Sequence, residues 1–150
     1  MIIREMNEND IEGVSHVCLD AFFDSVAGLL SDEGIATFAA IASPDAFANR
    51  MKVDNRILVA EGDNGEIVGV VELKEGRHIA MLFVTPSQQK CGIGRRLLET
   101  VLIYARSETV TVSASLPSVP AYQKYGFKVQ GEVRELSGLV YQSMEIKVNQ

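Results

Sequence analysis

One stretch predicts both a local fold and a ligand site: Met81-Leu82-Phe83-Val84-Thr85-Pro86-Ser87-Gln88-Gln89-Lys90-Cys91-Gly92-Ile93-Gly94-Arg95-Arg96-Leu97-Leu98. Its apolar beginning is typical of a buried strand, which ends at Thr85-Pro86-Ser87. A polar loop with two glycines follows, and the residues after Gly94 predict a helix. A strand, a loop of unpaired backbone N–H groups and a helix N-terminus together form a site for an anion, most often phosphate.

Composition narrows the class of protein. The chain has 150 residues, of which 47% are hydrophobic and 23% charged, and this balance predicts one globular domain over residues 1–150. No apolar run reaches the roughly 18 residues of a membrane span, so we expect no membrane partner. The first residues are charged too early for a secretory signal, which predicts a cytoplasmic protein with free thiols at Cys18 and Cys91. A net charge of −6 argues against nucleic acid as a partner.

The apolar pattern along the chain predicts a mixed α/β fold. Asp63-Asn64-Gly65 indicates a hairpin because Asn-Gly tolerates positive φ. We expect strands at 1–6, 56–61, 66–73, 78–84, 110–114, 127–133 and 140–148, and helices after residue 10 and near 32–41, 44–52, 92–107 and 119–125. We summarise the order as β-α-α-β-β-β-α-β-α-β-β.

Two common phosphate-binding loops do not match the glycines. A P-loop needs Gly-Lys and then Ser or Thr at the helix start, whereas this chain has Gly94-Arg95-Arg96. A dinucleotide fingerprint needs a third glycine where Leu97 stands, and it belongs in a βαβ unit rather than after an antiparallel meander. A third kind of loop fits better.

Gln89-x-x-Gly92-x-Gly94 is similar to the Q/R-x-x-G-x-G/A signature of the GNAT superfamily of N-acetyltransferases, which bind acetyl-coenzyme A. The preceding Leu82–Pro86 resembles the fourth strand of that superfamily, and Ala121–Phe127 resembles its second signature, Y-x-x-x-G-F. Met144-Glu145-Ile146 resembles its final strand. The resemblance covers nearly the whole chain. It implies a GNAT-type α/β (α+β) fold, with a mostly antiparallel sheet of about seven strands flanked by about four helices.

The resemblance also implies where acetyl-CoA binds. Loop amides hold the pyrophosphate in this superfamily, and the matching positions are Gln89, Lys90, Cys91, Gly92, Ile93, Gly94 and Arg95. The backbone of Leu82 and Val84 stands where the pantetheine arm bonds, and the Val84 amide is also expected to polarise the thioester carbonyl. Ser113 lies near the position where many members carry an asparagine that contacts the cofactor.

Tyr122 occupies the position of the tyrosine that commonly protonates the departing thiolate, and a packed tyrosine is the alternative. His78 falls at the position of the catalytic glutamate of histone-type members, and an imidazole suits a general base near neutrality. An exposed histidine at a hairpin end is equally consistent. Glu72 on the neighbouring strand is the next candidate for the base. A cysteine at position 91 would lie at the pyrophosphate, which argues against an acyl-enzyme.

The function expected from this resemblance is direct transfer of an acetyl group from acetyl-CoA to a primary amine of a small molecule. Two alternatives stay open: an acyl-CoA sensor with little or no catalysis, and an acetyltransferase for protein N-termini or lysines. No metal ion is expected. A homodimer is compatible with the resemblance because many members form one. The sequence does not identify the acceptor.

Overall fold

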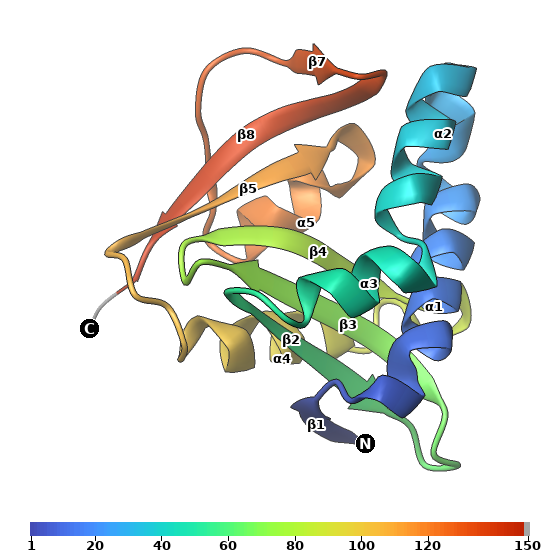
Figure 1. The fold of residues 1–150 in the computed structure, drawn as a ribbon. Helices are drawn as coiled ribbons and strands as arrows, with labels where there is room; N and C mark the ends of the chain where they lie inside the picture. The colour runs from blue at the N-terminus through green and yellow to red at the C-terminus, as the bar shows by residue number, and fades with distance from the viewer. Residues whose placement is uncertain (149–150) are drawn as a thin grey trace.

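The computed structural model describes residues 1–148, whose strands form one eight-stranded sheet with helices on both faces (Figure 1). The strands are β1 (Ile2–Glu5), β2 (Asn55–Glu61), β3 (Ile67–Lys74), β4 (His78–Val84), β5 (Thr109–Ser115), β6 (Lys128–Val129), β7 (Arg134–Leu136) and β8 (Leu139–Lys147). Their order is β1-β2-β3-β4-β5-β8-β6, with β7 also paired to β8. Only the β4–β5 pair is parallel among the described residues. The predicted fold class, mostly antiparallel and mixed α/β, is confirmed.

Five α-helices cover this sheet in the described part of the chain: α1 (Ile11–Ser25), α2 (Asp32–Ile41), α3 (Pro44–Arg50), α4 (Ile93–Leu102) and α5 (Val119–Lys124). Short 3-10 turns are η1 (Glu8–Asp10), η2 (Ala27–Leu29), η3 (Pro86–Gln88) and η4 (Leu116–Ser118). Three helices precede β2, at the three places that the sequence predicts, although the summarised order counted only two of them. Ser31 and Ser43 begin α2 and α3, because each caps the new helix with its side-chain oxygen. None of these helices has the length and apolar character that crossing a bilayer requires.

Two predicted elements are shorter in the structure. The helix expected over 92–107 ends at Leu102, and the strand expected over 127–133 is reduced to Lys128–Val129, with a separate β7 after it. Val133 is half exposed, so no buried face extends the strand through it. The periodic pattern identified these elements but not their ends, because tertiary packing decides where pairing stops.

The sheet separates two hydrophobic cores because its side chains alternate between the two faces. On one face, Val59 and Val70 pack with α1, α2 and α3, which lie together on one side of the sheet in Figure 1. On the other face, Leu58 and Val71 pack with α4 and α5. Neighbouring residues of one strand therefore belong to opposite cores, and both faces of the sheet are buried.

The central strand β4 contains an irregularity that shapes the middle of the sheet. Glu72 pairs with Met81 and Leu73 pairs with Ile79, so Ala80 is an extra residue, a β-bulge. Beyond the bulge, β4 no longer pairs with β5: their register is limited to His78–Thr111 and Ile79–Val112. The remaining lengths of the two strands diverge, as the ribbon shows (Figure 1).

A buried ion pair joins α3 to the sheet. Glu72 is fully buried, and its Oε2 accepts a hydrogen bond of 2.9 Å from Nε of Arg50. Burial raises the pKa of Glu72, while the nearby Arg50 opposes that rise. The second carboxylate oxygen, Oε1, has no protein partner among the described residues. Glu72 therefore depends on Arg50 to remain charged inside the protein.

We expect Arg50→Met to lower the free energy of unfolding by about 3 kcal/mol, because it leaves the buried Glu72 carboxylate without its cation. Urea denaturation measures the loss. Arg77→Met breaks the exposed Arg77–Glu75 pair of 2.7 Å and serves as the control, with a change expected below about 1 kcal/mol. Equal losses in the two variants would contradict this role for Arg50.

Candidate active site

A cleft of about 1090 Å³ opens where β4 and β5 diverge. Thr85 N donates to Val68 O on β3, so strand alternation turns the N–H groups of Leu82 and Val84 toward β5. Both residues line the cleft, and β5 is no longer paired there. The cleft wall therefore presents backbone donors to which an extended ligand can bond as an added strand.

The glycine loop closes one end of this cleft. Gln89 Nε2 donates to Val84 O over 3.0 Å, which fixes the loop to the end of β4. Lys90 and Gly92 adopt left-handed φ of 65° and 83°, and α4 begins at Ile93 without a side-chain cap. The first N–H groups of α4 thus lack intrahelical partners. A Cβ on Gly92 would meet nothing within 4 Å, so the space above the loop is open to an anion.

Close packing between α4 and α5 supports the loop from behind. A Cβ on Gly94 would lie 3.0 Å from the Tyr125 hydroxyl oxygen. Arg95 donates to Lys124 O over 3.3 Å, and its guanidinium lies 5.2 Å from the centre of the Tyr125 ring. Cys91 is exposed and does not line the cleft. Arg95 thus links the two helices while it lines the cleft.

Tyr122 lies across the cleft from β4, on α5. It is 6% exposed, and its ring packs edge-to-face on Phe127 with centroids 5.3 Å apart. Burial raises the pKa of the Tyr122 phenol, and the nearby Tyr125 adds to the rise. The phenol therefore keeps its proton near neutral pH and can donate it to a stronger base. Ser113 lines the cleft from β5.

The two residues considered as a general base lie outside the cleft lining. His78 stands where β4 and β5 still pair, and its Nδ1 is 2.8 Å from the Thr111 hydroxyl oxygen. Burial lowers the pKa of His78, and the positive charges of Lys74 and Arg77 add to this. Glu72 pairs with Arg50 instead. Among the described residues that line the cleft, none is Asp, Glu or His.

The structure adds lining residues that sequence motifs did not indicate. Phe38 of α2 stacks on Phe22 of α1 with centroids 4.1 Å apart, and both line the cleft. Tyr141 lines it from β8, opposite Ser115 in the strand register. An apolar helix face and strand alternation were the available signals, and neither distinguishes a cleft wall from core.

Comparison with known proteins assigns the chain to a family. A family model described as an acetyltransferase (GNAT) domain matches residues 26–148, and the chain belongs to this family. Proteins named peptidyl-lysine N-acetyltransferase YjaB are similar over 74 residues: that of Escherichia coli (strain K12) is 38% identical over 49% of this chain and 50% of its own length. For YjaB of Salmonella typhimurium, identity is 39% over the same shares. The similarity thus spans about half the length of these curated relatives.

Solved structures share the fold over nearly the whole chain. A GCN5-related N-acetyltransferase from Rhodopseudomonas palustris has a TM-score of 0.83 at 23% identity, over 98% of this chain and 95% of that one. The PaiA N-acetyltransferase of Thermoplasma acidophilum, in complex with coenzyme A, has a TM-score of 0.79 at 24% identity, over 98% of both chains. Apo YjaB from Escherichia coli has a TM-score of 0.72 at 27% identity, over 97% of this chain and 96% of that one.

His78 is expected to titrate below the ordinary histidine value of about 6.5. The folded protein holds the imidazole neutral, so the unfolded chain binds a proton more readily as the pH falls through about 6.5. The free energy of unfolding contributed by His78 therefore decreases with decreasing pH in this range.

NMR of the two imidazoles across this range measures the titration, with His78→Gln and His16→Gln to assign the signals. Urea denaturation at both ends of the range compares the wild type with His78→Gln. A His78 signal that titrates at or above 6.5 would contradict the burial effect.

Proposed function

We propose that this chain is an acetyl-CoA-dependent N-acetyltransferase that transfers the acetyl group directly to a primary amine. The observation that carries this proposal is the cleft between the diverging β4 and β5. It combines free strand amides on one wall, an anion-binding loop at one end and a buried phenol on the other wall. Membership of the GNAT family supports it, as does the coenzyme A bound to the similar PaiA protein.

The residues of the cleft fit the parts of coenzyme A. The N–H groups of Gly92, Ile93 and Gly94 suit the pyrophosphate, and the positive charges of Lys90 and Lys124 favour its approach. The pantetheine arm has amide groups of its own, which suit the backbone of Leu82 and Val84. With the arm against β4, the thioester lies deep in the cleft, where Ser113 and Tyr122 face it from the other side.

The reaction then needs few protein groups, since a thioester is already activated and the cleft holds the reactants together. The amine nitrogen forms a bond to the acetyl carbon, and the Val84 N–H stabilises the oxyanion that develops. The carbon–sulfur bond breaks, and Tyr122 donates its proton to the leaving thiolate. The nitrogen loses one proton and restores the phenol through solvent.

We assign the acceptor to small-molecule amines. A second candidate is a lysine side chain of a protein, because the similar YjaB proteins are named peptidyl-lysine N-acetyltransferases. A sensor that binds acetyl-CoA without turnover remains the alternative outside enzymes. Release of coenzyme A in the presence of amines, amino acid derivatives and lysine peptides separates these functions.

Gly92→Ala is expected to weaken coenzyme A binding about tenfold. An alanine at φ 83° is strained by about 1–2 kcal/mol, and the loop relieves that strain by a shift that moves its amides away from the phosphate. Gly65→Ala is a matched control: Gly65 also has φ 83° and open space within 4 Å of where a Cβ would lie, but it belongs to the β2–β3 hairpin. Calorimetry gives the affinities and urea denaturation the stabilities. Both variants lose similar stability, and an equal loss of affinity in both would contradict the loop's role.

Tyr122→Phe is expected to lower kcat by about 10²-fold or more, because it removes the acid that protonates the thiolate. The dissociation constant of coenzyme A should stay within a few-fold, since the ring and its packing on Phe127 are retained. Steady-state kinetics and calorimetry measure the two quantities. Tyr104→Phe, at an exposed tyrosine outside the cleft, is the control. An unchanged kcat in Tyr122→Phe would remove this residue from the mechanism.

A further inference from the structure

The cleft has an apolar part on the side of the sheet that carries α1 and α2. We call it the acceptor lobe, and it is lined by Phe22, Val26, Leu30, Phe38, Met81 and Phe83. Phe22, Phe38 and Met81 also belong to the core beneath α1 and α2, so this lobe lies across β4 from α4. In the proposed enzyme the acceptor amine approaches the thioester from here.

All charges along the described lining of the cleft are positive, and they come from the loop, α4 and α5. They are Lys90, Arg95 and Lys124, and the other titratable lining groups are Tyr122, Tyr125 and Tyr141. The acceptor lobe itself has no charged side chain. An ammonium ion entering the cleft therefore meets cations at one end and apolar groups at the other.

Carboxylates near the lobe are engaged elsewhere or face solvent. Asp24 of α1 is exposed to solvent and accepts a hydrogen bond of 3.1 Å from Ser25, which lines the cleft, and Asp20 is exposed as well. Glu72 pairs in register with Met81, but its charge is held by Arg50 at 2.9 Å. On β4, His78 is bonded to Thr111. None of these four groups lines the cleft.

The free energy of transfer from water into the lobe differs between amines according to their charge. Moving an ammonium ion out of water into an apolar site without a counter-charge is strongly unfavourable, whereas a neutral amine has a much smaller penalty. An α-amine with a pKa of about 8 is roughly 10% neutral at pH 7, but an alkylamine with a pKa of about 10.4 is only about 0.04% neutral. The lobe thus selects acceptors that are weak bases.

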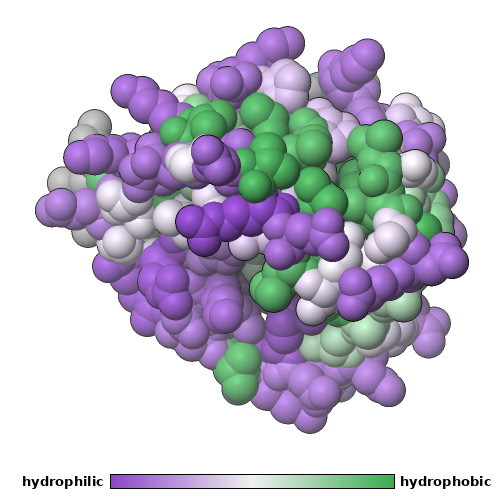
Figure 2. Space-filling view, turned by 90° about the horizontal axis from the view of Figure 1, so that it is seen from above, coloured by the Kyte–Doolittle hydropathy of each residue, from purple (hydrophilic) through white to green (hydrophobic). Residues whose placement is uncertain are grey.

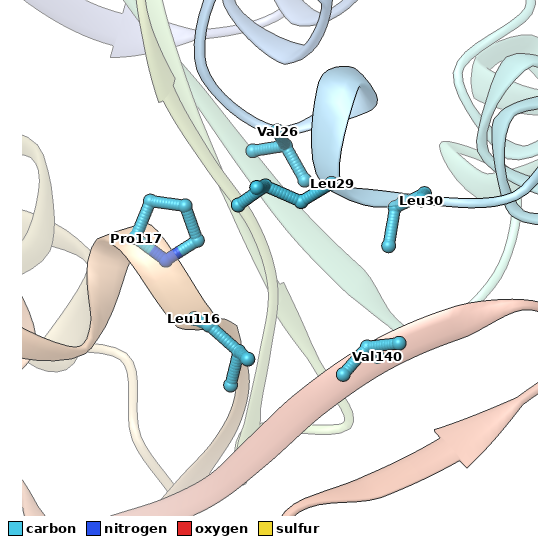
Figure 3. Close-up of a pocket in the computed structure, with 6 residues that line it drawn as sticks. All are labelled: Val26, Leu29, Leu30, Leu116, Pro117 and Val140. Carbon is cyan, nitrogen blue, oxygen red and sulfur yellow. The ribbon is translucent and has the colours of Figure 1, made fainter.

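A small side pocket opens from the acceptor lobe. Val26, Leu29, Leu30, Leu116, Pro117 and Val140 surround it, and these side chains from η2, η4 and β8 converge on one space (Figure 3). Four of them also line the main cleft. Its volume of about 30 Å³ is two to three times the ~10–15 Å³ that one water needs, which is room for the methyl groups at the tip of a branched alkyl chain that extends from the main cleft.

The side chains of the six residues that line this side pocket are all apolar. Leu29 and Leu116 are 67% and 41% exposed and lie together in the lining of this pocket, so they add apolar surface that a bound ligand can cover. Seen from above the view of Figure 1, the surface of the protein carries hydrophobic residues grouped among polar ones (Figure 2). An alkyl group of the acceptor would remove this apolar surface from water.

We propose that the acceptor is a small, weakly basic primary amine that enters the lobe uncharged and seats an apolar substituent in the side pocket. This inference rests on the proposed acetyltransferase function. The proton balance supports it: a neutral amine loses one proton as the amide forms, and the sulfur gains one. No net proton acceptor is needed, which agrees with a described cleft lining that holds no carboxylate or imidazole.

The test compares two acceptors with the same branched skeleton, leucine amide and 3-methylbutylamine, at saturating acetyl-CoA. At pH 7 we expect kcat/KM for leucine amide to exceed that for 3-methylbutylamine about 10²-fold, as their neutral fractions do. Divided by the neutral fraction, kcat/KM should agree within a few-fold for the two amines and be independent of pH between 6 and 8. Equal or higher kcat/KM for 3-methylbutylamine at pH 7 would overturn the inference.

Two further comparisons test the charge and the pocket. Ser25→Asp places a carboxylate at the edge of the lobe, and it should raise kcat/KM for 3-methylbutylamine at least about tenfold over the matched Ser25→Asn variant.

Glycine amide lacks the alkyl group and should lose about tenfold in kcat/KM relative to leucine amide. An equal kcat/KM for glycine amide and leucine amide would refute the pocket's role.

Failure of this inference is distinct from failure of the proposed function. Acetylation of lysine peptides or alkylamines in preference to α-amines at pH 7 would overturn the inference and leave the acetyltransferase function intact. Tight binding of acetyl-CoA with no acetylation of any amine would overturn both. Mass spectrometry of the products and measurement of coenzyme A release separate these outcomes.

Discussion

The loss of pairing between β4 and β5 is the constraint on which the rest of the structure depends. A strand in the middle of a sheet normally has both edges bonded, and buried backbone groups without partners are unfavourable. Here β3 holds one edge of β4 along its whole length, while β5 is held by β8 over all of its residues. Each of the two strands thus keeps one fully paired neighbour, and the gap between them stays open beyond Ile79. The unpaired amides of β4 are therefore available to a ligand, which can satisfy them.

The bulge at Ala80 decides which side chains of β4 face each side of the sheet along this gap. In a regular strand Ile79 and Met81 would face the same side. The extra residue sends Ile79 into the core beneath α4 and Met81 into the core beneath α1. The part of β4 beyond the bulge therefore aims Leu82 and Val84 toward the α4 side and Phe83 toward the acceptor lobe. One inserted residue thus lets a single strand face both the proposed coenzyme A site and the acceptor lobe.

Local patterns predicted the parts of the fold and site that local physics determines. The strand at 78–84, the loop with Gly92 and the start of the helix after it depend on neighbouring residues, so the sequence was sufficient for them. The bulge at Ala80 depends on pairing with β3, and the contribution of Tyr141 depends on β8 returning beside β5. Neither the bulge nor the position of Tyr141 can be predicted from the spacing of apolar residues. Glu72 shows the same limit: its position on a strand suggested catalysis, but only the fold shows Arg50 beside it.

One end of the cleft is positively charged and the other is uncharged, and this difference suits the two substrates of an acetyl transfer. Coenzyme A has several negative charges that stay in contact with water, so exposed cations and helix amides attract it without large desolvation. An amine must become neutral before it can attack, and a carboxylate in the acceptor lobe would stabilise the unreactive ammonium form. The chain has a net charge of −6, yet the described lining of the cleft has no acidic residue. With that charge outside the cleft, the proposed amine nucleophile meets no carboxylate that would hold it in the unreactive ammonium form.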